Sequence, residues 1–252
     1  MKDRVVVITG ASAGLGAALA RQVGNQGAAV VLLARREHEL NDVAQAVGPK
    51  ALPIVTDVTQ RAQVEAALAA AIVRFGKVDV WVNNAGRGIT RAVSALTDAD
   101  LDDMIRVNVK AALYGMQAVL PHFQQRGRGH IINISSMLSR VPFAPTRSAY
   151  AAAKHALNAL TANLRMELAG PFPGIAVSLV HPGVVATDFG LNAQHGGVDS
   201  RVLPGAQDAE EVAAVIVDVI ERPRADVYTR PGAQQAVVNY FAAPDMAAAE
   251  PR

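Results

Sequence analysis

Residues 5–16 read VVVITGASAGLG, a run of β-branched residues that leads directly into a glycine-rich turn. The run from Val5 to Thr9 is typical of a short, buried parallel strand. The residues from Leu15 to Val23 have the character of a helix that begins at the turn. This strand, turn and helix together predict an α/β fold.

The glycines of this turn indicate a phosphate site. They allow a tight turn and let the backbone approach a pyrophosphate, while the helix N-terminus offers free N–H groups and a partial positive charge. Their spacing is Gly-x-x-x-Gly-x-Gly rather than the general Gly-x-Gly-x-x-Gly, so an ordinary strand–helix turn is the competing interpretation of this motif alone. The predicted cofactor contacts in the turn are Gly10, Ser12, Ala13, Gly14, Leu15 and Gly16.

Strand-like and helix-like segments alternate along the rest of the chain. Further short apolar runs occur at 29–33, 52–55, 78–82, 130–134 and 175–180. Segments of helical length lie at about 37–47, 60–75, 98–125, 148–169 and 207–221. This order predicts a parallel sheet with helices on both faces, joined by right-handed crossovers. We expect one domain over residues 1–242 and a loose C-terminal tail over residues 243–252.

The composition narrows the class of protein. Hydrophobic residues make up 51% of the 252-residue chain and aromatic residues 4%, which suits a sizeable core of buried strands covered by Ala-rich helices. The net charge of +2, without a dense basic run, does not indicate a nucleic-acid partner. The chain has no cysteine, and its histidines lack metal-ligand spacing, so we expect no metal. The first apolar run is too short for a signal peptide or a membrane span, so we expect a cytoplasmic protein without a membrane partner.

The end of the second predicted strand bears on the choice of cofactor. In a dinucleotide fold an acid at this point binds the ribose 2′-hydroxyl, whereas an arginine accommodates a 2′-phosphate. Here Ala34 is followed by Arg35 and Arg36, and a planar guanidinium matches phosphate oxygens. We therefore expect NADP(H), with both arginines as contacts. The competing interpretation is a pair of solvated surface charges.

Several further motifs follow the glycine turn in order. They are Asp57-Val58-Thr59, Asn83-Asn84-Ala85-Gly86, Asn108, Asn133-Ile134-Ser135-Ser136, Tyr150-Ala-Ala-Ala-Lys154 and Pro182-Gly183-Val184-Val185-Ala186-Thr187. With these motifs the chain resembles the short-chain dehydrogenase/reductase family over nearly its whole length, residues 3–230. The resemblance implies an oxidoreductase with a three-layer, doubly wound Rossmann fold and a seven-stranded parallel sheet.

The resemblance also implies roles for individual residues. Catalysis falls to Asn108, Ser136, Tyr150 and Lys154, with Ser135 as a minor alternative for the serine. Asp57 and Val58 would contact the adenine, and the segment 182–187 would hold the nicotinamide carboxamide. The implied cofactor contacts beyond the turn and the arginine pair are Asp57, Val58, Asn84, Ala85, Gly86, Tyr150, Lys154, Pro182, Gly183, Val185 and Thr187.

Two features depart from the pattern of the family. Ser136 lies fourteen positions before Tyr150, one more than the commonest spacing, so the loop 137–148 is expected to bulge near the substrate. The chain also lacks the frequent C-terminal, glycine-ending signature that helps to build tetramers. We therefore expect a homodimer formed through the helices at 98–125 and 148–169, with a tetramer as the alternative.

The chemistry of these residues agrees with their implied roles. Tyr150 and Lys154 are four positions apart on a predicted helix and therefore share one face. A neighbouring ammonium lowers the pKa of a phenol toward the working pH, so we expect Tyr150 to donate a proton in reduction and accept one in oxidation. By the resemblance, Lys154 also binds the nicotinamide ribose, Ser136 the substrate oxygen, and Asn108 a water that links Lys154 to solvent.

The segment from Phe189 to about Pro204 corresponds to the mobile substrate lid of this family. With the loop after Ser136, it predicts a mostly apolar pocket for a small ketone, aldehyde or secondary alcohol. The residues expected to contact the substrate are Met137, Leu138, Phe143, Phe189 and Leu191, with Val141 near them. His195 and Arg201 are either polar anchors or exposed residues.

The leading hypothesis is thus an NADPH-dependent oxidoreductase that interconverts a small carbonyl compound and its alcohol. The same scaffold also serves other reaction types, such as those of an epimerase or a dehydratase. A non-catalytic NADP(H)-binding sensor is the alternative from a different class. The complete catalytic set favours an enzyme, because a sensor need not keep it.

Overall fold

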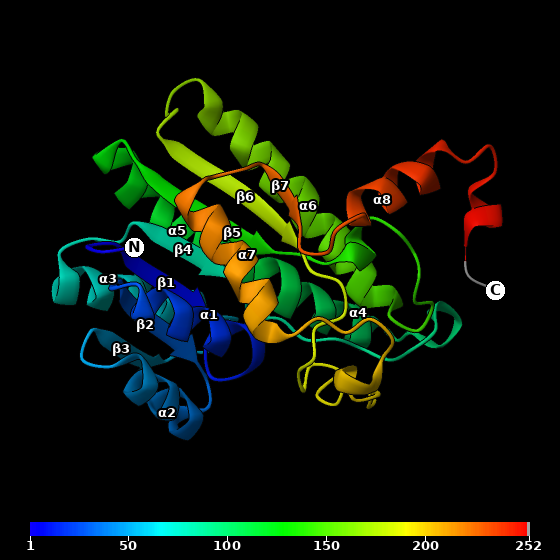
Figure 1. The fold of residues 1–252 in the computed structure, drawn as a ribbon, viewed down its shortest axis with the longest axis horizontal. Coiled ribbons are helices and arrows are strands. Elements are labelled where there is room, and N and C mark those ends of the chain that lie inside the picture. Colours follow the sequence, from blue (N-terminus) through cyan, green and yellow to red (C-terminus); the bar gives the residue numbers. More distant parts are fainter. Residues whose placement is uncertain (251–252) are drawn as a thin grey trace.

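A seven-stranded parallel sheet lies in the middle of the molecule in the computed structural model, which describes residues 1–250 (Figure 1). The strands are β1 (Val5–Thr9), β2 (Ala29–Ala34), β3 (Ala51–Val55), β4 (Val80–Asn83), β5 (Gly129–Ile134), β6 (Ile175–His181) and β7 (Asp226–Tyr228). Their order across the sheet is β3-β2-β1-β4-β5-β6-β7, and every neighbouring pair is parallel. The expected seven-stranded, doubly wound fold is confirmed.

Helices cover both faces of the sheet. One face carries α1 (Gly14–Asn25), α2 (Glu37–Val47) and α7 (Ala209–Glu221), and the other carries α3 (Arg61–Phe75), α5 (Ala111–Arg126) and α6 (Ser148–Ala169). Along β1, Val6 and Ile8 pack into the first hydrophobic cluster, and Val5 and Val7 into the second. Because both faces are covered, the strand is a continuous apolar run rather than an alternating one.

The strand order reverses between β1 and β4. From β1 the sheet runs through β2 to β3 on one side, whereas β4 to β7 extend the other side. In doubly wound sheets, the crevice outside the carboxyl ends of the strands at such a reversal is the usual ligand site. Thr9 and Asn83 close these two strands, so the residues that follow them meet in that crevice.

Shorter elements gather at the same end of the sheet. They include α4 (Asp98–Ile105), α8 (Ala233–Ala242) and residues 189–204, here named the lid segment, which contains a 3-10 helix at Ser200–Val202. Figure 1 shows them together on the right of the view, away from the N-terminus. Within residues 1–250, no helix combines the length and the apolar character needed to cross a membrane.

The predicted helices agree with the structure in most places. Those at 37–47 and 148–169 coincide with α2 and α6. The helix expected at 98–125 is instead made of α4, a π-helical turn (Arg106–Lys110) and α5. The π-helical turn, which contains Asn108, accommodates one extra residue and so interrupts the α-helix.

The C-terminal part was the hardest to predict. β7 spans three residues with Val227 as its buried side chain, which is too short for a recognisable apolar run. In the segment expected to be a loose tail, Met246–Ala249 form a 3-10 helix and the Tyr240 hydroxyl donates to the Glu250 carboxylate at 3.1 Å. Residues 251–252 of that prediction lie outside the described residues.

Candidate active site

The glycine turn packs directly against the chain that follows β4. Asn84 Nδ2 donates to the carbonyl oxygens of Thr9 and Gly10 at 2.9 and 3.3 Å, and Thr9 Oγ1 accepts from the backbone N–H groups of Asn84 and Ala85 at 2.9 and 3.0 Å. A Cβ at Gly16 would overlap the Gly10 carbonyl oxygen. Gly10 itself has a φ of 67°, a conformation that favours glycine. The turn is therefore held by hydrogen bonds between side chains and backbone and by close packing at Gly16.

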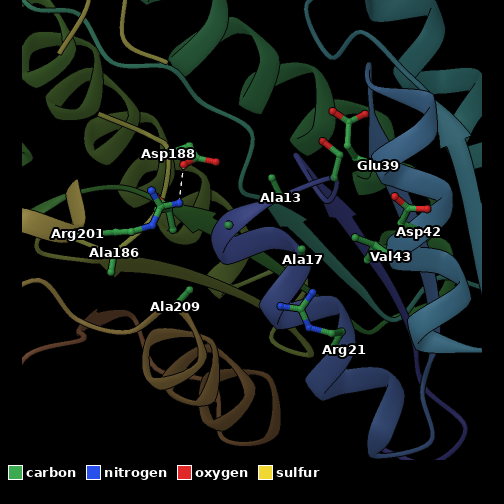
Figure 2. A pocket seen from close by; sticks show the side chains of 13 residues that line it. Ala13, Ala17, Arg21, Glu39, Asp42, Val43, Ala186, Asp188, Arg201 and Ala209 are labelled. Carbon is green, nitrogen blue, oxygen red and sulfur yellow. Dashed lines mark hydrogen bonds and ion pairs between the residues drawn. The ribbon is translucent and has the colours of Figure 1, made fainter. Parts of the chain in front are cut away.

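The first turn of α1 is open to an anion. Ala13 stands at the N-cap and has no side-chain acceptor for the first N–H groups of the helix. With Ser12, Gly14 and Thr187 it lines a pocket between α1, α2 and the segment after β6 (Figure 2). Free N–H groups, a helix N-terminus and small side chains fit the pyrophosphate of a nicotinamide dinucleotide.

Arg36 and Ser12 lie together beside this pocket. Arg36 Nε and Nη2 approach Ser12 Oγ at 3.3 and 3.2 Å, and Arg36 Nη1 lies 3.3 Å from a Glu39 carboxylate oxygen. The structure thus joins two of the predicted cofactor contacts through side chains that both hydrogen-bond phosphate readily.

Arg35 faces the end of β3 instead. Burial disfavours the charged form of Asp57, but hydrogen bonds from Thr59 and then the charge of Arg35 outweigh it, and the pKa of Asp57 is lowered. Val58, the next predicted contact, packs against the hydrophobic cluster on the α3 and α5 face. The two predicted arginines thus interact with different groups: Arg35 with Asp57, and Arg36 with Ser12 and Glu39.

The segment after β6 completes the wall of the crevice. The Pro182 carbonyl accepts from the Met137 N–H at 2.9 Å, which ties this segment to the chain after β5. Val185 pairs with Gln207 in an isolated bridge, and Thr187 stands 3.1 Å from the place of a Cβ on Gly14. These contacts bring the predicted segment 182–187 to the glycine turn.

Asn108 sits in the π-helical turn between α4 and α5. Its amide bonds to the backbone: Nδ2 donates to the carbonyls of Arg87 and Met104 at 3.0 and 3.1 Å, and Oδ1 accepts one bond, from the Arg87 N–H at 3.2 Å. A Cβ on Gly86 would lie 2.9 Å from Asn108 Oδ1 and 3.6 Å from Lys154 Nζ. The extra residue in the turn thus directs Asn108 toward the lysine.

Ser136, Tyr150 and Lys154 come together at the carboxyl end of β5. Ser136 Oγ accepts from the Leu138 N–H at 3.1 Å, and the Ser136 hydroxyl lies near that of Tyr150. Lys154 Nζ donates to the Ile134 carbonyl at 2.9 Å and lies 5.7 Å from the centroid of the Tyr150 ring. All three side chains are buried. Ser135, the alternative serine, donates to Asn158 at 2.6 Å and so is part of a separate network.

Burial dominates the titration of the two ionisable groups. It raises the pKa of Tyr150 to about 12, although the nearby Ser136 hydroxyl and the charge of Arg147 act in the opposite direction. Burial also lowers the pKa of Lys154 to about 8. The prediction that the pKa of Tyr150 is lowered is wrong for this arrangement, because burial outweighs the groups that favour the phenolate.

A buried chain of polar groups fixes α6 against the sheet. Trp81 Nε1 donates to Asn83 Oδ1 at 2.8 Å, and Asn83 Nδ2 donates to Asn133 Oδ1 at 2.8 Å. Asn133 Nδ2 in turn donates to Thr161 Oγ1 at 2.8 Å, and Thr161 donates to the Leu157 carbonyl. Buried polar groups require such partners, so the chain links β4, β5 and the helix that bears Tyr150.

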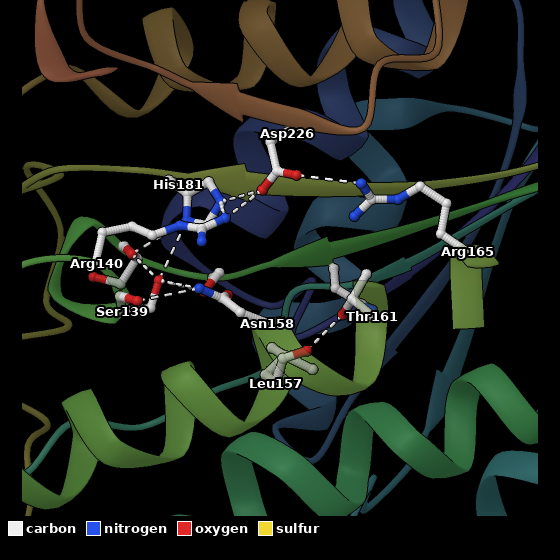
Figure 3. A network of polar contacts seen from close by, with 11 residues as sticks. Ser139, Arg140, Leu157, Asn158, Thr161, Arg165, His181 and Asp226 are labelled. Carbon is white, nitrogen blue, oxygen red and sulfur yellow. Dashed lines mark hydrogen bonds and ion pairs between the residues drawn. The ribbon is translucent and has the colours of Figure 1, made fainter. Parts of the chain in front are cut away.

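A second polar network supports the serine loop (Figure 3). His181 Nδ1 lies 3.3 Å from the Ser136 carbonyl, and its Nε2 lies 3.0 Å from Asp226, which also pairs with Arg140 and Arg165. The hydrogen bond with His181 is the main cause that lowers the pKa of Asp226 to about 2, against the effect of burial. Through the contact of His181 with the Ser136 carbonyl, this network fixes the backbone of the predicted catalytic serine.

The lid segment meets the body of the protein at a buried carboxylate. Asp100, on α4, lies 2.6 Å from His195 Nε2, 3.1 Å from Gln194 Nε2 and 2.9 Å from Arg91 Nη1. The Gln194 backbone also bonds to the strand-like stretch 88–90, at 2.9 and 3.0 Å. Of the two polar residues left open by the sequence, His195 is therefore an anchor, whereas Arg201 pairs with Asp188 and Asp199 at the surface.

The predicted substrate contacts divide into two groups. Phe189 packs on Tyr150 with ring centroids 5.6 Å apart, and Leu138 packs on the hydrophobic cluster that contains Tyr150. Phe143 instead packs edge-on against Tyr240 of α8 at 6.1 Å, and Leu191 is half exposed. Met137 is half-buried in the 3-10 helix after Ser136.

Four residues of the site were missed by the sequence analysis. Thr9 acts through its hydroxyl on a segment 75 residues away, and Asp100 and Asp226 act on distant loops. Arg147, three residues before Tyr150, stands out only because its position one turn earlier on the helix predicts the same face.

Comparison with known proteins places this arrangement among oxidoreductases. The family model described as short chain dehydrogenase matches residues 4–196. An uncharacterized oxidoreductase of Staphylococcus epidermidis is 38% identical over 223 residues, which cover 88% of this chain and 93% of that protein.

Solved structures agree in fold. A short-chain dehydrogenase/reductase from Burkholderia phymatum in complex with NAD superposes with a TM-score of 0.87 and 26% identity, covering 95% of this chain and 93% of the other. An alcohol dehydrogenase from the archaeon Thermococcus sibiricus, complexed with 5-hydroxy-NADP, superposes with a TM-score of 0.77 and 28% identity, covering 89% and 94%. This chain belongs to the short-chain dehydrogenase/reductase family of oxidoreductases.

Proposed function

We propose that this protein is an NADPH-dependent oxidoreductase that interconverts a small, mostly apolar ketone or aldehyde and the corresponding alcohol. The observation that carries the proposal is the buried cluster of Ser136, Tyr150 and Lys154 at the crevice of the sheet. The nicotinamide supplies the hydride in reduction and takes it up in oxidation. The protein supplies the proton, the position and the polar surroundings.

Tyr150 is the proposed general acid and base. With a pKa of about 12, it keeps its proton at neutral pH until a strongly basic alkoxide develops on the substrate oxygen. The Ser136 hydroxyl, which lies near that of Tyr150, hydrogen-bonds the same oxygen. Lys154 is charged below a pH of about 8 and stabilises the phenolate that remains. Asn108, beside Gly86 and near Lys154, holds the water that links the lysine to solvent.

The proposed preference for NADPH rests on the arginines after β2. Arg36 shares Ser12 as a partner at the edge of the pocket, where a phosphate group would meet both side chains. Arg35 adds positive charge at the neighbouring strand end. No carboxylate of residues 1–250 takes the position directly after β2 that would favour a free ribose 2′-hydroxyl.

The proposed enzyme is a cytoplasmic homodimer whose catalytic domain comprises residues 1–242, with a tetramer as the alternative assembly. Leu160 and Met166 are exposed on α6, and Leu101 is exposed on α4, so these helices offer apolar contacts to a second copy. Light scattering after size-exclusion chromatography measures this assembly directly.

The test of the function is an assay of the purified protein with a panel of small ketones and aldehydes. Oxidation is followed by the absorbance of the reduced nicotinamide, with NADPH and NADH in parallel. We expect turnover with NADPH favoured. A protein that binds NADPH but turns over no member of the panel contradicts the proposed reaction and supports a sensor.

A further inference from the structure

Arg147 is the arginine beside Tyr150 that lacks an acidic partner. It is half-buried at the start of α6, and Nη1 donates to the Ile89 carbonyl at 3.2 Å. Burial lowers its pKa, and Tyr150 is the group that works against this effect. Within residues 1–250, no carboxylate forms an ion pair with Arg147. At neutral pH, where Tyr150 keeps its proton, the hydrogen bond to the Ile89 carbonyl is the contact shown for this charge.

Several arginines around the site are paired. Arg91 meets the buried Asp100 at 2.9 Å, Arg140 meets Asp226 at 2.6 Å, and Arg201 meets Asp188 at 2.5 Å. A partly desolvated charge without a counter-charge is costly. The unpaired charge of Arg147, next to the proposed acid, therefore needs an explanation.

Two glycines lie close to the guanidinium of Arg147, on the side of the lid segment. A Cβ on Gly88 would stand 3.0 Å from Arg147 Nη1 and 3.1 Å from the Phe189 ring, and a Cβ on Gly197 would stand 3.2 Å from Arg147 Nη2. Phe189 in turn packs on Tyr150. Because Gly88 and Gly197 have no side chains, the guanidinium fits beside the lid segment. The ring of Phe189 lies between it and Tyr150, the proposed acid.

We propose that Arg147 binds a carboxylate group of the substrate, so that the carbonyl compound reduced at Tyr150 is a short oxo acid with an otherwise apolar skeleton. The guanidinium fork suits a carboxylate, with which it forms two parallel hydrogen bonds. Phe189 and Leu138 cover the apolar part of the molecule. The inference rests on the proposed function for the carbonyl and adds the second point of attachment.

The kinetic test compares short oxo acids with their methyl esters, which share the carbon skeleton but lack the charge. We expect the wild-type kcat/KM to be higher for the acid. Arg147→Met should lower kcat/KM for the acid by about 10- to 100-fold, the range for one charge-assisted hydrogen bond, and leave the ester within about twofold. Arg147→Lys should restore part of the loss. Arg222→Met, on an exposed arginine paired with Asp218 away from the site, is the matched control and should leave the ratio unchanged.

Two kinetic outcomes would overturn the inference while the proposed function stands. The first is a wild-type enzyme that reduces the ester as well as the acid. The second is an Arg147→Met variant that loses both activities in parallel, which is the result expected of a purely structural arginine.

A binding measurement separates failure of the inference from failure of the function. Calorimetry measures the affinity of a short saturated alkanoate, which has no carbonyl to reduce, for the complex with NADP⁺. Binding by the wild type that Arg147→Met weakens supports the carboxylate site, even if no oxo acid is turned over and the proposed reaction fails. Absence of alkanoate binding overturns it.

Discussion

The glycine turn (residues 9–16) and the lid segment face the same crevice but are held in different ways. The turn is fixed by neutral hydrogen bonds of the Thr9 hydroxyl and the Asn84 amide with backbone groups, at distances of 2.9 to 3.3 Å. The lid segment is joined to the body by a backbone bridge at Gln194, by the packing of Phe189 on Tyr150 and by contacts with the Asp100 carboxylate. The proposed cofactor side is thus held by contacts that are insensitive to salt, whereas the proposed substrate side depends in part on a charged group whose contacts salt weakens.

Tyr150 stands where the two regions meet, so its replacement should produce the largest effect. Tyr150→Phe removes the proton that reduction requires, and we expect kcat to fall by about 10²–10⁴-fold. NADPH affinity, measured by fluorescence titration, should be unchanged because the glycine turn is intact. Near-normal turnover in this variant would exclude Tyr150 as the acid.

The same small change in each region tests the contrast directly. In Gly16→Ala the new Cβ overlaps the Gly10 carbonyl, and relief of such overpacking costs about 1–3 kcal/mol, or about 10- to 100-fold in NADPH affinity. The control is Gly196→Ala in the lid segment, where φ is 79° and a Cβ meets nothing within 4 Å. It should leave NADPH affinity unaltered. Equal losses of NADPH affinity in both variants would contradict the inference that the glycine turn, and not the lid segment, forms the cofactor site.

The next largest effect is expected on the cofactor preference, when an arginine after β2 is replaced. Arg36→Ala removes a charged partner of the proposed 2′-phosphate, so the ratio of kcat/KM for NADPH to that for NADH should fall by about 10- to 100-fold. NADH kinetics serve as the internal control, because this cofactor has no 2′-phosphate. A ratio that stays constant would show that Arg36 is a solvated surface charge.

The pH dependence of reduction reports on Lys154. Its pKa is lowered to about 8, so the lysine is charged below that pH and neutral above it, and kcat/KM should fall about tenfold per pH unit above 8. Tyr150, with a pKa of about 12, keeps its proton throughout this range. Lys154→Arg should move the fall to higher pH, since guanidinium stays charged. A fall that stays near pH 8 in that variant belongs to another group.

The smallest effect is expected at the anchor of the lid segment. Asp100→Asn preserves the shape but removes the charge that meets His195 and Arg91, so the substrate KM should rise several-fold while NADPH affinity holds. Asp199→Asn, which alters a carboxylate paired only within the segment itself, is the control. The rise should shrink in high salt, where the wild-type contact is itself weakened. A KM that is independent of Asp100 would mean that the backbone bridge alone holds the segment.

Periodic and ordered features were predictable from the sequence. The apolar runs located six strands, and the order of motifs located the glycine turn, Ser136, Tyr150 and Lys154, because each lies at the end of a strand or on one helix face. The prediction failed where local pattern carries little information. β7 has a single buried side chain, and the π-helical turn at Asn108 differs from an α-helix by one residue. The direction of the Tyr150 pKa shift was also wrong, since burial depends on the whole fold.

The amino-acid sequence was enough to predict the fold class, the family and the residues that we propose to carry the chemistry, because these depend on strand and helix periods and on short motifs that follow one another along the chain. The folded arrangement was needed to see which charges meet. Asp100 reaches His195 across 95 positions, Asp226 supports the serine loop across 45 positions through His181, and Arg147 is left with a backbone carbonyl rather than an acidic partner. Pairing between such distant groups is set by the packing of the sheet and its helices, which no local pattern encodes.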